Sequence, residues 1–255
     1  MTLKAFKPVI FLLLASPLLA EVLVSFNTPV SSLLVPITWL WMVIGYGIPV
    51  LLIKKIRDRF HLGLSALLLM GLAYGILNEG ILAHTLTQTA GAPVAAYVGY
   101  GTWLGINFSW ATFILPWHAL VSVCLPILLA DFLFSPQTVN QPTANLKTTA
   151  YFGFFGLNII YFLGLLAPIK KFPSPVIYIV IGWGLFALLL YYVIKNNWPP
   201  LKLLVLSLSF AMGFSVLTAV IKGGTTLILA GILLIFGLMI LKKIPSNHEG
   251  ARVPG

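Results

Sequence analysis

Residues 62–84 read LGLSALLLMGLAYGILNEGILAH, and this stretch decides both the class of fold and the place to look for a site. It is long and apolar enough to cross a hydrocarbon layer of about 30 Å as one helix. Deep within the run, the one ionisable side chain is Glu79. A carboxyl group at membrane depth is costly, and it persists mostly where it has a partner or a task. We therefore predict a membrane-spanning helix with a polar centre at Glu79.

Small residues line the face of this helix that carries the acid. Gly71, Gly75 and Glu79 are spaced four apart, so they lie on one side of the helix. A Gly-xxx-Gly pattern lets a second helix approach closely. We expect Gly71 and Gly75 to form a helix–helix contact, and Glu79 to face protein and not lipid.

The composition places the whole chain in the same class. Hydrophobic residues make up 60% of it, charged residues 8%, and the mean hydropathy is +1.03. Soluble proteins average about 25% charged residues, so we predict an all-α, polytopic transmembrane helix bundle whose main partner is the lipid bilayer. The net charge of +10 does not indicate nucleic-acid binding, because no stretch is long enough to form a soluble basic domain. The single cysteine, Cys124, excludes a disulfide framework, and we predict neither a metal site nor a cofactor.

Windows of about 20 apolar residues predict about eight spanning helices. They cover Pro8–Val24, Leu34–Ile53, Leu62–Leu86, Phe108–Phe132, Ala150–Pro168, Pro175–Ile194, Leu201–Ile221 and Thr225–Leu241. The first one resembles a signal peptide, but Leu18 fits poorly at the −3 position of a cleavage site. We favour a retained anchor; cleavage would leave seven helices.

Basic residues between the helices predict the orientation. With both termini cytoplasmic, twelve Lys and Arg side chains lie inside and three outside, as the positive-inside rule requires. The inner set is Lys4, Lys7, Lys54, Lys55, Arg57, Arg59, Lys147, Lys195, Lys202, Lys242, Lys243 and Arg252; the outer set is Lys170, Lys171 and Lys222. We interpret the run Lys54–Arg59 as a topology determinant that could also contact anionic headgroups.

The chain divides into four predicted parts. Residues 1–134 form a four-helix half that holds the polar side chains, and residues 135–149 form a cytoplasmic linker rich in Pro, Asn, Gln, Ser and Thr. Residues 150–243 form an apolar four-helix scaffold half, and residues 244–255 form a disordered tail. Chemistry or binding is therefore expected in the first half.

His118 is the expected partner of Glu79, and the two are the candidate catalytic residues. Pro116 precedes the histidine inside the same helix, so we expect a bend there beside a small hydrated cavity. Four further residues are candidates for binding: Glu21, His84, Asn107 and Trp110.

The remaining polar positions have plainer interpretations. Asn107 suits the N-cap of its helix, and Asp131 is expected to be a solvated residue at a helix end. The connection 85–106 is uncharged and rich in Gly and aromatic residues. We expect it to rest at the interface, with its aromatic rings at headgroup level, and to cover the site.

Several motifs resemble a known set of proteins. They include Ser16-Pro-Leu-Leu-Ala-Glu21, the decapeptide Gly71–Gly80, Asn107-x-x-Trp110 and His118. Together they are similar to a family of uncharacterised prokaryotic multi-pass membrane proteins with no established activity. This resemblance implies a location in the plasma membrane of a prokaryote.

A weaker resemblance is to glutamate-dependent intramembrane proteases of the CAAX protease-like type, which use paired glutamates on one helix and histidines on later helices. Glu79 and His118 match that pattern in kind. Asn78 stands where one glutamate is expected and Ala83 where an arginine is expected, and helices after residue 150 contain no histidine.

Three functions remain open from the sequence. The first is binding or transport of a small solute or lipid, with Glu79 as the ionisable group and His118 as its partner. The second is a membrane hydrolase in which Glu79 activates water. The third is an assembly subunit that docks a partner helix on Gly71 and Gly75.

Overall fold

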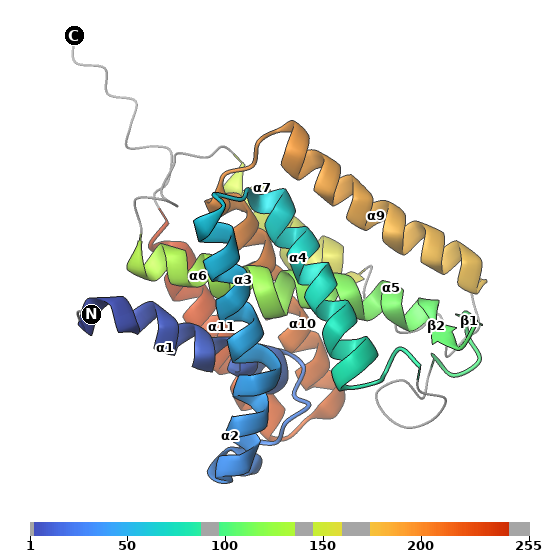
Figure 1. Ribbon diagram of the computed structural model, residues 1–255, viewed down its shortest axis with the longest axis horizontal. Helices are drawn as coiled ribbons and strands as arrows, with labels where there is room; N and C mark the ends of the chain where they lie inside the picture. Colours follow the sequence, from blue (N-terminus) through green and yellow to red (C-terminus); the bar gives the residue numbers. More distant parts are fainter. Residues whose placement is uncertain (1–2, 88–96, 136–144, 160–173, 245–255) are drawn as a thin grey trace.

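The computed structural model describes residues 3–87, 97–135, 145–159 and 174–244, and in these the chain is a bundle of long helices (Figure 1). Seven helices are long and apolar enough to cross a membrane: Phe6–Val24, Pro36–Arg59, Leu64–Leu82, Phe108–Phe134, Pro175–Lys195, Pro200–Lys222 and Thr225–Lys242. They confirm the all-α polytopic fold and match seven of the eight predicted spans. The eighth, Ala150–Pro168, lies partly outside the described residues.

Most spans before residue 160 combine α-helical and π-helical segments. The first four are α1 (Leu3–Pro17) with η1 (Leu18–Val24), α2 (Pro36–Met42) with η3 (Val43–Gly47) and α3 (Ile48–Arg59), α4 (Leu64–Leu77) with η4 (Asn78–Leu82), and α5 (Phe108–Trp117) with η6 (His118–Cys124) and α6 (Leu125–Phe134). A 3-10 helix, η2 (Val30–Leu34), precedes α2, and α7 (Leu146–Tyr151) leads into the π-helical η8 (Phe152–Leu157). The last three are α9 (Pro175–Lys195), α10 (Pro200–Lys222) and α11 (Thr225–Lys242).

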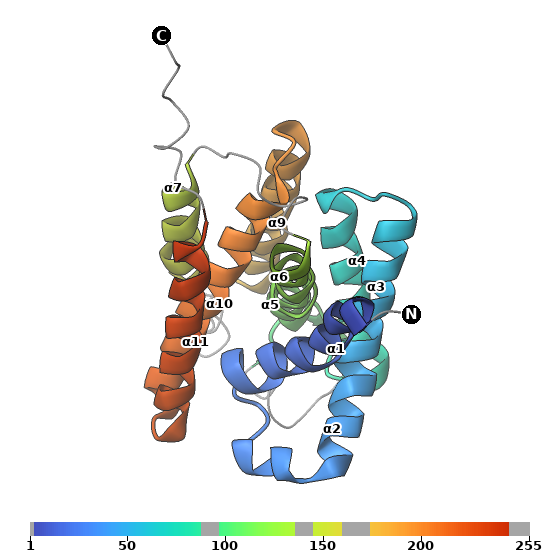
Figure 2. The same ribbon diagram turned by 90° about the vertical axis from the view of Figure 1, so that its left-hand side faces the viewer.

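The helix α5–η6–α6 forms the centre of the bundle. The most apolar window of Phe108–Phe134 is entirely buried inside the protein. Figure 2 looks nearly along this helix and shows α3 and α4 on one side, α10 and α11 on the other, and α9 above it. This span carries buried polar side chains, among them His118, Ser122 and Asp131, and such groups are costly against lipid, so the interior of the bundle suits it. It positions His118 at the core of the molecule.

The stripe of glycines brings α4 onto this central helix. A Cβ atom on Gly71 would lie 2.7 Å from Cα of Ala119, and one on Gly75 would lie 3.2 Å from Cβ of His118. The predicted close approach is therefore made within the chain, and Glu79 lies against His118. The same face is not open to a helix of another protein in this structure.

The connection 85–106, described here at 85–87 and 97–106, differs in part from its prediction. β1 (Thr102–Trp103) pairs antiparallel with β2 (Ile106–Asn107), and the two residues between them have positive φ angles of 48° and 77°. Trp103 is 67% exposed, as expected for a ring at headgroup level, but Tyr97 and Tyr100 are buried. Tyr97 packs on Trp110 with 5.3 Å between ring centroids, because Asn107 holds its backbone carbonyl.

One hydrophobic core contains side chains from both predicted halves, among them Leu128 from the first and Phe210 from the second. The helix α10 is the second most buried span.

The linker predicted at 135–149 is described at its ends, where α7 already begins at Leu146. The disordered tail predicted for 244–255 lies outside the described residues apart from Ile244. The division into a polar and an apolar half stays a prediction.

Candidate functional site

Glu79 lies in the π-helical segment η4 and is 7% exposed. Its Oε1 atom is 2.7 Å from Nε2 of His118, 39 residues later. Its Oε2 atom accepts a hydrogen bond from the hydroxyl of Thr85. That hydroxyl in turn accepts from Nε1 of Trp110 at 2.9 Å. Both carboxylate oxygens thus have partners from within the chain, as expected for an acid that faces protein.

His118 uses both of its ring nitrogens. Nδ1 lies 2.9 Å from Oγ of Ser122, one helical turn further on. The backbone carbonyl of Ser122 accepts a hydrogen bond from the hydroxyl of Ser16 at 3.0 Å, which ties the first span to the centre. His118 is 1% exposed, and Trp117 meets its ring edge-on at 5.3 Å. Glu79, His118 and Ser122 therefore form a continuous hydrogen-bonded row.

A second acid, Glu21, is hydrogen-bonded to a tyrosine whose ring contacts His118. Glu21 accepts hydrogen bonds from the hydroxyl of Tyr46 and, at 3.3 Å, from that of Thr28. The ring of Tyr46 stacks on His118 with 6.2 Å between centroids, and Tyr74 meets His118 edge-on at 5.5 Å. Glu21 is half-buried, and its partner Thr28 follows the exposed Asn27 in the chain, so this branch of the cluster reaches the protein surface.

Tyr74 also fixes the backbone around the centre. Its hydroxyl donates to the carbonyl of Gly45 at 2.8 Å and accepts from Nδ2 of Asn78 at 2.6 Å. Gly45 lies next to Tyr46, so this bond joins the second and third spans beside the stacked ring. Asn78 is buried and acts here as a hydrogen-bond donor.

Four π-helical segments meet at this place. η1 carries Glu21, η3 carries Tyr46, η4 carries Glu79, and η6 carries His118 with Ser122. A π turn is rare and occurs frequently at functional sites. We call Glu21, Tyr46, Glu79, His118 and Ser122 the polar centre.

The sequence identified only part of the polar centre. Glu79, His118 and Glu21 were predicted, and the structure brings them together. Tyr46 and Ser122 were missed, and their signals were weak: a hydroxyl inside an apolar run, and a serine four residues after the histidine. Thr85 and Tyr74, which support the centre, were missed as well.

The other candidates have different positions. Trp110 contacts the centre through Thr85. Asn107 is the predicted N-cap, since its side-chain oxygen accepts from the backbone N–H of Trp110 at 2.9 Å. His84 is exposed, with a φ angle of 56°, and no contact joins it to the polar centre. The bend predicted at Pro116 stays a prediction; the π-helical η6 begins two residues after this proline.

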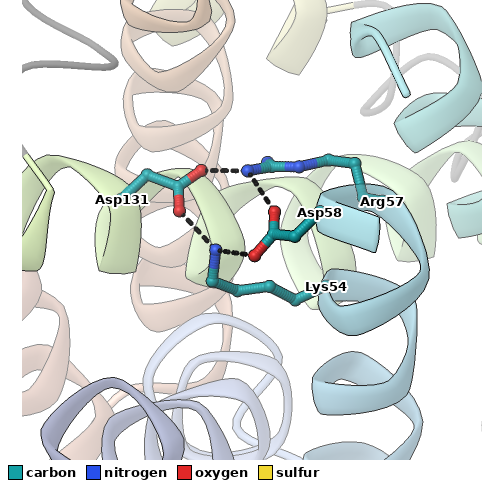
Figure 3. A network of polar contacts seen from close by, with 4 residues as sticks. All are labelled: Lys54, Arg57, Asp58 and Asp131. Carbon is teal, nitrogen blue, oxygen red and sulfur yellow. Dashed lines mark hydrogen bonds and ion pairs between the residues drawn. The ribbon is translucent and has the colours of Figure 1, made fainter. Parts of the chain in front are cut away.

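Asp131 is not the solvated residue that we expected. It is 6% exposed and pairs with Nζ of Lys54 at 2.7 Å and with Nη2 of Arg57 at 2.5 Å (Figure 3). Asp58 completes the network with contacts of 2.8 and 3.1 Å to the same two cations. Lys54 and Arg57 are therefore paired with protein carboxylates, and α3 extends six residues beyond the predicted end at Ile53.

Comparison with known proteins gives one result. A family model described as "Uncharacterized membrane protein family" matches residues 10–248. The match extends well beyond the first half of the chain, where the sequence motifs were recognised. No curated protein and no solved structure matches the chain. The similarity to glutamate-dependent proteases stays a prediction.

Proposed function

The chain belongs to this uncharacterized membrane protein family, to which no activity is assigned, and we propose from its own residues that it is a proton-coupled membrane protein that binds or transports a small solute. The observation that carries the proposal is the convergence of titratable side chains from four π-helical segments on one buried point. In the proposal, the pair Glu79 and His118 holds the coupling proton.

The pair has the chemistry for that role. A carboxyl and an imidazole in direct contact at 2.7 Å are jointly neutral when they share one proton, whereas with none or with two protons one group is left charged alone in a buried site at a large cost. The number of protons on the pair therefore decides whether it is charged or neutral. Ionisable residues at membrane depth commonly serve ion pathways and proton relays.

The second acid offers a route for the proton. Glu21 is half-buried, and its hydrogen bond to Tyr46 leads to a ring that lies on His118. A proton taken up at Glu21 can be passed to the hydroxyl of Tyr46, and a rotation of this side chain is needed to bring the hydroxyl to the pair, because only its ring now lies on His118. Small rotations of Tyr46 would open or close this route, since its hydroxyl holds the acid on one side and its ring covers the imidazole on the other.

The π turns provide a way to couple protonation to movement. Each π turn contains one residue more than an α turn. A helix in which a π turn becomes an α turn must therefore shift its register or rotate the residues that follow the turn. Glu79 and His118 each lie within such a turn, so a change in their charge acts directly on these π-helical segments. Solute access would change with the packing of these helices.

A direct contact argues against the hydrolase alternative in its simplest form. A general base needs a water within reach, but both oxygens of Glu79 already have protein partners. The row Ser122–His118–Glu79 has the order of a nucleophile, a base and an acid, and it keeps a hydrolase as the second candidate. The assembly-subunit alternative loses its docking face, since Gly71 and Gly75 already contact the central helix.

The location is part of the same proposal. The chain is a membrane protein, and the family match and the spanning helices support this directly. We propose the plasma membrane of a prokaryote, with both termini in the cytoplasm. The twelve-to-three distribution of basic residues supports the orientation.

The test uses the full chain in liposomes that contain a pH-sensitive dye. A pH gradient is imposed, and amino acids, sugars, amines and carboxylates are added one class at a time. We expect one class to change the rate of proton entry at least tenfold, and Glu79→Gln to abolish the change. Asp58→Asn, which removes an exposed carboxylate elsewhere, should leave it intact. Equal rates in wild type and Glu79→Gln with every class would contradict the proposal.

A further inference from the structure

A cavity of about 510 Å³ lies on the other side of the central helix from the polar centre. Thr112, Pro116 and Leu120 form one of its walls and are spaced four apart, so they share a helix face. His118 is two residues from both Pro116 and Leu120, which turns its side chain to the opposite face. The volume is within the range of about 300–1,000 Å³ that is typical of small-molecule sites.

The walls of this cavity are almost entirely apolar over most of its length. α5 and η6, η8 and α9 contribute aliphatic and aromatic side chains, among them Phe113, Phe152, Leu185, Phe186 and Leu189. Tyr178 and Tyr192 both line it and both lie on α9. At a rise of about 1.5 Å per residue, this separation corresponds to roughly 21 Å along the helix. The cavity is therefore long enough for an extended hydrocarbon chain.

Polar side chains gather at one end. α7 begins, α9 ends and α10 begins there, and the cavity is lined at this end by Asn145, Thr148, Tyr192, Trp198 and Lys202. The Nζ atom of Lys202 lies 4.7 Å from the centroid of the Trp198 ring. Among the residues that the structure describes, no carboxylate pairs with Lys202. Its charge is thus open to a ligand.

The cavity also reaches the lipid-facing surface. Leu188 lines it and is 49% exposed, and Tyr192 lines it and is 47% exposed. Only 11% of the most apolar window of α9 is buried inside the protein, so the outer side of this helix faces the hydrocarbon layer. A lipid can enter sideways past these two residues without leaving the membrane.

We propose that this cavity binds an anionic phospholipid, with an acyl chain along α9 and the headgroup phosphate on Lys202. The chemistry at the two ends fits such a molecule, because basic pockets between spanning helices bind acidic headgroups. Asn145 and Thr148 supply hydrogen-bonding groups beside the ammonium. The site is separate from the polar centre and does not depend on the function proposed for it.

The experiment is native mass spectrometry of the purified full chain. Phosphatidylglycerol and phosphatidylcholine with identical acyl chains are offered in equal amounts, and the retained lipid is counted. We expect phosphatidylglycerol to be preferred roughly fivefold, which is the effect of one basic side chain near an anionic headgroup. Lys202→Gln should reduce the preference below twofold. Lys195→Gln removes a charge that lies over Tyr191 at the same end of α9, outside the cavity, and should leave the preference unchanged.

A second pair of variants tests the chain-binding part. Leu189→Trp fills the cavity and should remove retention of both lipids, whereas Ala187→Trp places the same ring on the exposed face of α9 and should not. If Leu189→Trp does not fold, Leu185→Phe provides a smaller filling. The proposal is overturned if Lys202→Gln keeps the full preference, or if a folded cavity-filling variant retains as much lipid as wild type.

Discussion

Nζ of Lys54 lies 2.7 Å from Oδ1 of Asp131, a residue 77 positions later in the chain. Arg57 contacts the other oxygen of the same carboxylate, so one acid joins the end of α3 to the end of the central helix (Figure 3). Part of the basic run 54–59, which orients the chain in the sequence interpretation, thus also forms a tertiary contact.

Asp131→Asn should lower the free energy of unfolding by about 3 kcal/mol, because two mostly buried cations lose their shared partner. Unfolding in mixed detergent micelles measures the change. Asp58→Asn is the matched control: its side chain is 49% exposed, so we expect a loss below about 1 kcal/mol. Equal losses for the two variants would mean that Asp131 has no special role.

Gly71→Ala should destabilise the chain by about 1–3 kcal/mol, because the added methyl group meets the backbone of Ala119 on the central helix. Gly80→Ala is the control, since its Cβ would lie 3.6 Å from a Leu86 methyl group in ordinary contact. Its effect should stay within about 0.5 kcal/mol. The same unfolding assay compares them, and a stable Gly71→Ala variant would refute the tight contact.

The orientation of the chain in the membrane can be determined by labelling single cysteines introduced at the ends of a span. Cys124 is fully buried, so it should not react with a membrane-impermeant maleimide. Ser174 and Asn196 are exposed and stand at opposite ends of α9. We expect Ser174→Cys to be labelled in intact cells and Asn196→Cys only after permeabilisation. The reverse pattern would invert the topology and place the basic ends outside.

The sequence predicted the spans and the central acid well because both depend on local properties. A run of apolar residues predicts its own helix, and Glu79 is conspicuous against such a background. The stripe of Gly71 and Gly75 predicted correctly that the acid faces protein, since small residues mark a helix contact wherever the partner comes from.

The remaining features depend on contacts between distant segments. Asp131 stands at a helix end, and nothing near it in the sequence indicates that Lys54 and Arg57 would cover it. Tyr46 joins the polar centre only because its ring reaches His118 from another span. The π turns could not be predicted either, since no residue pattern in these runs separates a π turn from an α turn.

The central claim is that Glu79 and His118 hold a proton inside the bundle. Infrared difference spectra of the full chain, recorded between acidic and alkaline pH, test it most directly, because the sequence has only five Asp and Glu side chains. We predict a carboxylic-acid C=O band that changes with pH, is lost in Glu79→Gln, and has a different pH midpoint in His118→Asn. Asp58→Asn should leave this band in place. A wild-type spectrum whose pH-dependent carboxyl bands all survive in Glu79→Gln would contradict the account.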